Sequence, residues 1–215
     1  MVLGVDFDNT IVDYGELMHE IASQWRLVGR DCPKTKKAVR DSIRRLPEGE
    51  LHWRRLQAEA YGARMQEARP AAGVGDLFLT CRNRGIAVYI VSHKTECSNL
   101  GQSDVSFRTA AVAWLESSGF FDPQGIALER TRVFFHDSRQ EKIERIRSLR
   151  VTHFIDDLEE LFHEPLFPKD VVPILFSPER PSSDGDRIRS FASWNQIADY
   201  VLGGVCVLET SANHG

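Results

Sequence analysis

Val2-Leu3-Gly4-Val5-Asp6-Phe7-Asp8-Asn9-Thr10, near the start of the chain, is the segment that most strongly indicates the fold. It opens with a short apolar run, which is typical of a strand buried inside a parallel sheet. The run ends at Asp6, and Asp8 and Thr10 follow closely. Because ligands bind beyond the carboxyl ends of the strands in an open parallel sheet, this opening predicts a buried strand that leads polar side chains to a ligand site.

The chain after residue 76 alternates between helical and strand-like apolar patterns. This alternation indicates a parallel sheet with helices on both faces. Strands are expected at 86–91, 133–135, 151–155 and 171–176. Helices are expected between Asp76 and Gly85 and at 107–118, 138–149, 158–163 and 187–202. The predicted fold class is α/β, a Rossmann-like parallel sheet sandwiched by helices.

Residues 14–75 have a different pattern, because apolar residues recur there every three or four positions and indicate three amphipathic helices. Small residues and prolines at 70–75 are typical of a linker out of this segment. The predicted domains are an α/β core at 1–13 and 76–205, an all-helical insertion at 14–75 and a tail at 206–215.

The composition indicates a soluble globular protein: 42% of the 215 residues are hydrophobic, 27% are charged and the formal net charge is −4. This apolar content excludes a chain that is disordered throughout. No apolar run reaches the ~20 residues of a membrane span, and the start lacks the features of a signal peptide, so a cytoplasmic protein without membrane contact is expected. The four cysteines have no zinc-ligand spacing and are expected to be reduced.

Basic charge is concentrated in the helical insertion, which has twelve Lys and Arg residues against eight Asp and Glu residues. The two signs are interleaved in helical phase, which favours a solvated helix face over nucleic-acid binding. No nucleic-acid partner is expected. Arg26, Arg30, Arg54 and Arg55 are the candidates in this segment for contact with an anionic substrate.

Polar side chains follow three of the expected strands, and one lysine lies a turn into a following helix. These side chains are Asp6, Asp8, Thr10, Ser92, His93, Lys142, Asp156 and Asp157. Four carboxylates at one edge of a sheet repel one another, by about 4 kcal/mol for a pair 4 Å apart at an effective dielectric constant near 20. A hard divalent cation with oxygen ligands removes this repulsion, and Mg²⁺ suits a site that also binds phosphate.

These residues resemble the four motifs of the haloacid dehalogenase-like (HAD) superfamily, a large group of phosphohydrolases that form an aspartyl phosphate. Asp6-Phe7-Asp8-Asn9-Thr10-Ile11-Val12 resembles the first motif, and the segment from Gly73 to Ser92 resembles the second. Lys142 and the stretch His153-Phe154-Ile155-Asp156-Asp157 resemble the third and fourth. The resemblance runs in order from Val2 to about Leu202, and it implies that the insertion at 14–75 is a small helical cap over the site.

The resemblance implies a role for each matching residue in phosphate ester hydrolysis. Asp6 is the implied nucleophile and Asp8 the general acid and then base. Ser92 and Lys142 are the implied contacts to the phosphoryl oxygens. Family members that cleave carbon–halogen or carbon–phosphorus bonds usually lack the second Asp, so Asp8 favours phosphate ester chemistry.

The implied metal is Mg²⁺, bound by Asp6, by Asp156 and by the main-chain carbonyl of Asp8. Asp157 is a further ligand, either directly or through water. Thr10 and His93 complete the predicted phosphate-binding set, although an exposed loop position remains open for His93. Lys94 is expected at the entrance of the site and solvated.

Several alternatives remain open on the sequence. A phosphotransferase has the same motifs as a phosphatase, and a catalytically silent phosphate-binding module has the same fold. A phosphorylated signalling receiver domain is disfavoured, because its acidic pair lies near the first strand and it has no 60-residue helical insertion. The expected partner is a small phosphorylated metabolite of unspecified identity, and the sequence does not distinguish a monomer from a homodimer.

Overall fold

The computed structural model describes residues 1–96, 105–180, 183–184 and 187–203. Its sheet has seven strands in the order β5-β4-β1-β6-β7-β9-β8, and every neighbouring pair is parallel except β8–β9. The strands are β1 (Val2–Val5), β4 (Ala87–His93), β5 (Val133–His136), β6 (His153–Asp156), β7 (Val172–Phe176), β8 (Ser183–Asp184) and β9 (Arg189–Phe191). The predicted α/β fold class is confirmed.

Helices cover the sheet in two separate apolar layers. One layer contains buried residues of α4 (Val74–Asn83), α5 (Phe107–Ser117) and α8 (Trp194–Gly203). The other contains buried residues of α6 (Arg139–Ser148) and α7 (Glu159–Phe162). Leu3 and Val5 of β1 belong to the first layer and Phe154 of β6 to the second, as expected when strands bury both faces.

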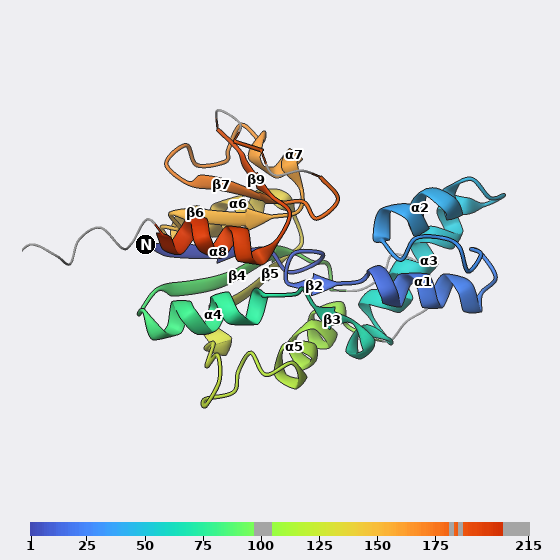
Figure 1. The fold of residues 1–215 in the computed structure, drawn as a ribbon, viewed down its shortest axis with the longest axis horizontal. Helices are drawn as coiled ribbons and strands as arrows, with labels where there is room; N and C mark the ends of the chain where they lie inside the picture. The colour runs from blue at the N-terminus through green and yellow to red at the C-terminus, as the bar shows by residue number, and fades with distance from the viewer. Residues whose placement is uncertain (97–104, 181–182, 185–186, 204–215) are drawn as a thin grey trace, which may run out of the picture.

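Three helices lie within residues 14–75 and form a group beside the rest of the molecule (Figure 1). They are α1 (Gly15–Gln24), α2 (Lys36–Arg44) and α3 (Gly49–Tyr61). Each helix buries apolar residues in a common core, among them Ile21 of α1, Ile43 of α2 and Leu56 of α3. A two-stranded ribbon of β2 (Val12–Asp13) and β3 (Arg69–Pro70) joins the start of this segment to its end. The spacing of apolar residues predicted the helices, but two-residue strands have no detectable period.

The aromatic side chain of Trp114 in α5 contacts both the exit of this helical segment and the residues that follow β1. Nε1 of Trp114 in α5 donates a hydrogen bond to the carbonyl oxygen of Ala68 at 2.8 Å, just before β3. The Trp114 ring also packs edge-on against Phe7, with ring centroids 5.7 Å apart. Residues near the end of β1 are therefore buried under α5 and the exit of the helical segment.

The described residues also contain two one-turn 3-10 helices, η1 (Met65–Glu67) and η2 (Arg130–Arg132).

One predicted element is wrong. Residues 187–202 were expected to form one helix, but Arg189–Phe191 form β9, which pairs in parallel with Ile174–Phe176, and α8 begins only at Trp194. The side chain of Ser193 accepts a hydrogen bond from the amide of Gln196 and marks the start of the helix. A strand of three residues is too short to show a period of two, so only its pairing with β7 identifies it.

The described part of the chain contains no helix with the length and apolar character that crossing a membrane requires. Cys32 and Cys81 are free thiols, whereas Cys97 and Cys206 lie outside the described residues. Burial raises the pKa of the Cys81 thiol to about 11, which keeps it protonated and unreactive. The predicted tail at 206–215 also lies outside the described residues.

Candidate active site

The carboxyl ends of β1 and β6 bring Asp6 and Asp156 to the same lysine. Nζ of Lys142 donates to Oδ1 of Asp6 and to Oδ2 of Asp156, at 2.6 Å in each case. All three side chains are buried. The parallel register pairs Val5 with Ile155, and the amide of Asp6 donates to the carbonyl oxygen of Ile155 at 2.9 Å. The two aspartates are therefore juxtaposed by the sheet itself, and α6 supplies the cation.

Asp157 completes a cluster of three carboxylates. One oxygen from each of Asp6, Asp156 and Asp157 lies within 4.8 Å of the others. Burial, together with the charge of Asp156, raises the pKa of Asp6 to about 6 although Lys142 opposes the change. Burial and the charges of Asp156 and Asp6 also raise the pKa of Asp157 well above its ordinary value. Two buried carboxylates and a partly buried one gather around the ammonium of Lys142, so the oxygen donors fit a hard divalent cation.

Asp8 lies outside this carboxylate cluster and has partners of its own. Nζ of Lys94 lies 3.0 Å from each carboxylate oxygen of Asp8, and the hydroxyl of Tyr14 donates to Oδ1 at 2.6 Å. The chain turns sharply here, because Asn9 has a φ of 62° and the amides of Ile11 and Val12 both donate to the carbonyl oxygen of Phe7. The side chain of Asp8 thus accepts hydrogen bonds from the Lys94 ammonium and from the Tyr14 hydroxyl. Metal binding through its main-chain carbonyl stays a prediction.

Ser92 lies at the same edge of the sheet and has an unpartnered hydroxyl. It lies near the end of β4, which pairs with β1, and is 1% exposed. Its Oγ has no hydrogen-bond partner among the described residues. A buried hydroxyl without a partner carries an energetic cost, so this atom is suited to a ligand oxygen.

The other two predicted phosphate contacts lie in different surroundings. Thr10 is fully buried, its Oγ1 has no partner among the described residues, and its carbonyl oxygen accepts a hydrogen bond from Nε1 of Trp194 at 3.2 Å. His93 is exposed, and its Nε2 lies 3.0 Å from the carbonyl oxygen of Asp137. Neither side chain has a contact with the carboxylate cluster among the described residues, so their roles in phosphate binding stay predictions.

The expectation that Lys94 is solvated is wrong. Lys94 is 4% exposed, and its ammonium lies over three aromatic rings, 5.4 Å from the centroid of Phe7, 5.0 Å from that of Tyr61 and 6.0 Å from that of Phe107. These rings come from the end of β1, from α3 and from α5. No local pattern around Lys94 indicates this environment, because every contributing residue is remote in sequence.

Lys36, at the first position of α2, was also missed. Burial lowers the pKa of Lys36, but the nearby Tyr61 hydroxyl and the carboxylates of Asp157 and Asp8 outweigh burial and raise it above the ordinary value. A cation from the helical segment is therefore near enough to Asp157 and Asp8 to interact with both electrostatically. In contrast, Arg26, Arg30, Arg54 and Arg55 are exposed, and within the described ranges none has a hydrogen bond or ion pair to a site residue.

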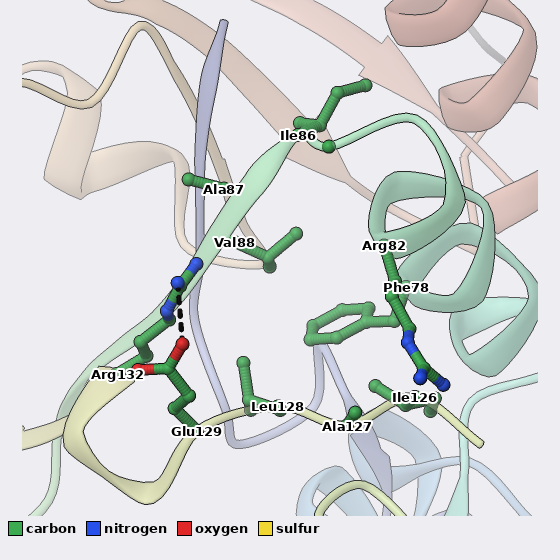
Figure 2. A pocket seen from close by; sticks show the side chains of 11 residues that line it. Phe78, Arg82, Ile86, Ala87, Val88, Ile126, Ala127, Leu128, Glu129 and Arg132 are labelled. Carbon is green, nitrogen blue, oxygen red and sulfur yellow. Dashed lines mark hydrogen bonds and ion pairs between the residues drawn. The ribbon is translucent and has the colours of Figure 1, made fainter. Parts of the chain in front are cut away.

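A cavity of about 320 Å³ lies at the opposite end of β4, away from these carboxylates (Figure 2). It is lined mainly by apolar side chains, among them Phe78, Val88 and Leu128. Arg132 at its rim is paired with Glu129, and the guanidinium of Arg82 donates to the carbonyl oxygens of Gly125 and Pro123. Its charged groups are thus already satisfied by the protein, and the carboxylate edge is the candidate active site.

Comparison with solved structures identifies the fold. A HAD family hydrolase from Deinococcus radiodurans R1 with bound phosphate and sodium superposes with a TM-score of 0.55 at 13% identity, over 95% of this chain and 96% of that one. A HAD-superfamily hydrolase from Ehrlichia chaffeensis gives 0.52 at 13% identity, over 95% and 97%. A haloacid dehalogenase-like family hydrolase from Xanthomonas campestris gives 0.51 at 11% identity, over 94% and 95%.

Comparisons with protein-family models and with curated proteins give no match. At 11–13% identity, the structural likeness shows that this chain has the fold of the HAD-superfamily hydrolases over nearly its whole length. The expectation of this fold from the four sequence motifs is confirmed.

Proposed function

We propose that this chain, which has the fold of the HAD-superfamily hydrolases, is a Mg²⁺-dependent phosphatase that hydrolyses a small phosphate monoester through an aspartyl phosphate. The observation that carries the proposal is the separation of two carboxylates two residues apart. Asp6 contacts Lys142 within the carboxylate cluster, whereas Asp8 contacts Lys94 and Tyr14. Two carboxylates in different environments suit the two roles of nucleophile and acid–base catalyst.

In the first step, Asp6 attacks the phosphorus atom of the ester. A bond forms between an Asp6 oxygen and phosphorus while the bond from phosphorus to the ester oxygen breaks. The leaving oxygen takes a proton from Asp8, so the alcohol departs neutral and Asp8 becomes a carboxylate. The ammonium of Lys142 and the hydroxyl of Ser92 stabilise the charge on the phosphoryl oxygens.

In the second step, water hydrolyses the aspartyl phosphate. Asp8 takes a proton from the water molecule as its oxygen bonds to phosphorus, and the bond from phosphorus to Asp6 breaks. Inorganic phosphate leaves, Asp6 is again a carboxylate and Asp8 is again protonated. The two steps therefore restore the starting protonation state.

Asp6, Asp156 and Asp157 are the side chains that would hold Mg²⁺. When bound, the ion supplies positive charge to the phosphoryl oxygens and allows the three carboxylates to stay ionised together. The Deinococcus structure is described with bound phosphate and sodium, and the likeness of fold supports the binding of an anion and a cation by this chain as well.

Asp8 also bears on the competing reactions. Displacement of halide from a haloacid has no leaving oxygen to protonate, so it does not require an acid at this position. A phosphotransferase is the second candidate, because it needs the same residues and differs only in the acceptor. Adding an acceptor alcohol and testing for a new phosphate ester distinguishes transfer from hydrolysis.

The decisive experiment is a screen of phosphorylated metabolites with Mg²⁺, in which released phosphate is measured. We expect release from at least one substrate, loss of release in excess chelator, and recovery with Mg²⁺ but not with Ca²⁺, whose larger coordination shell misplaces the nucleophile. Asp6→Asn should be inactive, and Asp170→Asn, which changes an exposed carboxylate, is the matched control. Full activity in excess chelator would exclude the metal.

A further inference from the structure

The carboxylate of Asp8 is almost saturated by hydrogen bonds in the described structure. A carboxylate has about four acceptor positions, two on each oxygen. Oδ1 accepts from the Tyr14 hydroxyl at 2.6 Å and from Nζ of Lys94 at 3.0 Å, which uses both of its positions. Oδ2 accepts from Lys94 alone, also at 3.0 Å. Within the described residues, the single open position on this carboxylate is therefore on Oδ2.

Both the main chain and the side-chain ammonium of Lys94 are held in place by neighbouring residues. Its amide donates to the carbonyl oxygen of His136 at 2.9 Å, and its own carbonyl oxygen accepts from Nε of Arg108 at 2.9 Å. Its ammonium is buried among the rings of Phe7, Tyr61 and Phe107. An ammonium in an aromatic enclosure is stabilised by the ring faces, and it contacts the carboxyl group of Asp8.

Tyr14 holds the same carboxylate from the side of the helical segment. Its side chain is buried, its ring packs edge-on against Tyr61 with centroids 4.8 Å apart, and its hydroxyl also lies 3.7 Å from the sulfur of Met65. Rotation of the Asp8 carboxylate would break the contact with Tyr14 or lengthen one of the two contacts with Lys94. The three contacts together define one orientation of the carboxylate.

We infer that Lys94 and Tyr14 are positioning residues that hold Asp8 in one orientation and leave Oδ2 as the oxygen that exchanges protons with substrate and water. The inference rests on the proposed function. In the first step Oδ2 gives its proton to the leaving oxygen as the bond to phosphorus breaks, and in the second step Oδ2 receives a proton from the attacking water. Oδ1 stays on Tyr14 throughout, so the carboxylate need not rotate between the steps.

The test is a double-mutant cycle on the full-length protein with Mg²⁺. We expect Tyr14→Phe to lower kcat about 10-fold and Lys94→Met about 100-fold, no more than the 10²- to 10⁴-fold typical of lost acid–base catalysis that we expect for Asp8→Asn. Because both residues act through Asp8, Asp8→Asn/Lys94→Met and Asp8→Asn/Tyr14→Phe should be no slower than Asp8→Asn alone. Losses that multiply in the double variants would overturn the inference. Lys37→Met, an exposed lysine of α2, and Tyr89→Phe are matched controls.

A leaving-group comparison separates positioning from a purely structural role. In single-turnover cleavage, Lys94→Met should slow an alkyl phosphate at least 10-fold more than p-nitrophenyl phosphate, because nitrophenolate departs without much help from an acid. Equal slowing of both compounds contradicts the assignment. Tyr14→Phe removes only a hydroxyl, so the comparison remains informative if Lys94→Met does not fold.

A crystal structure with Mg²⁺ and vanadate tests the geometry without turnover. The apical vanadate oxygen, which stands in for the leaving or attacking oxygen, should lie within hydrogen-bond distance of Oδ2 of Asp8, with Oδ1 still on Tyr14. An apical oxygen on Oδ1 overturns the inference. Phosphate release by the unchanged chain is the separate test of the proposed function, so multiplicative losses in an active enzyme refute the positioning role alone.

Discussion

The two halves of the candidate site are assembled in different ways. Asp6 follows β1 and Asp156 ends β6, so the parallel register of the sheet places them side by side, and Nζ of Lys142 from α6 lies 2.6 Å from an oxygen of each. Asp8 instead depends on Tyr14, which leads into α1, and on Lys94, which is enclosed by aromatic rings from α3, α5 and the loop after β1. The first half belongs to the sheet, and the second exists only where the helical segment meets it.

This difference separates two kinds of failure. Changes in the sheet half should remove the covalent chemistry or alter the charge balance at the metal site. Changes in the other half should leave the nucleophile intact and affect proton transfer or substrate choice. If the two halves are independent, substitutions can disturb either one while the other keeps its function.

The largest effect is expected for Asp6→Asn. Loss of a catalytic nucleophile lowers kcat by about 10⁵-fold or more. The variant should still fold, because an amide keeps the shape of the side chain and can accept a hydrogen bond from Lys142. Phosphate release and far-ultraviolet circular dichroism are the measurements, and turnover near that of the unchanged protein would refute the assignment of Asp6.

Asp8→Ala should cause a smaller loss of a different kind. We expect a 10²- to 10⁴-fold decrease in kcat, because departure of the alcohol and hydrolysis of the aspartyl phosphate both lose their acid–base catalyst. With p-nitrophenyl phosphate, whose first step needs little acid, phosphorylated protein should accumulate and be detectable by mass spectrometry after an acid quench. If Asp8→Ala loses as much activity as Asp6→Asn and never accumulates phosphorylated protein, the two halves are not separable.

The charge balance of the sheet half predicts a dependence of stability on pH. The pKa of Asp6 is raised to about 6, so the folded state binds more protons than the unfolded state between pH 4 and 6. This contribution to stability is complete below the ordinary pKa of an aspartate and is lost as the pH rises through about 6. It amounts to at most about 3 kcal/mol.

The measurement is the Tm of metal-free protein at pH 5 and pH 7.5. The unchanged protein should lose more Tm between these values than Asp6→Asn, which cannot titrate at this position. Mg²⁺ should raise the Tm more at pH 7.5 than at pH 5, because it binds the ionised carboxylates. Identical pH profiles for the unchanged protein and Asp6→Asn contradict the prediction.

The smallest effect is expected for Lys36→Met in the helical segment. Lys36 faces the site next to Tyr61, so its removal should raise KM about 10-fold for a substrate whose leaving group is anionic, with little change for p-nitrophenyl phosphate. Lys142→Met should lower kcat/KM for both compounds by similar factors, because it contacts the phosphoryl group that they share. A shift of preference in Lys142→Met, with equal losses in Lys36→Met, would contradict the division between the halves.

Local sequence patterns predict the residues of the sheet half of the site and most of the helices and strands that carry them. Asp6 ends an apolar run, Asp156 and Asp157 end another, and Lys142 lies one turn into a helix whose start is capped by Ser138. A parallel sheet needs only the order of its strands and helices to bring such residues to one edge. Local patterns are enough for the sheet half because each of its residues lies at the end of a predicted strand or in the first turns of a predicted helix.

The partners of Asp8, the burial of Lys94 and the strand at Arg189–Phe191 become visible only in the folded chain. Lys94 and Asp8 are 86 residues apart, and the rings around the ammonium come from segments with no pattern in common. An isolated lysine after a strand has the sequence signature of a solvated residue. Its actual environment depends on how the helical segment packs against α5, and side chains that meet only after that packing are invisible to periodicity and spacing.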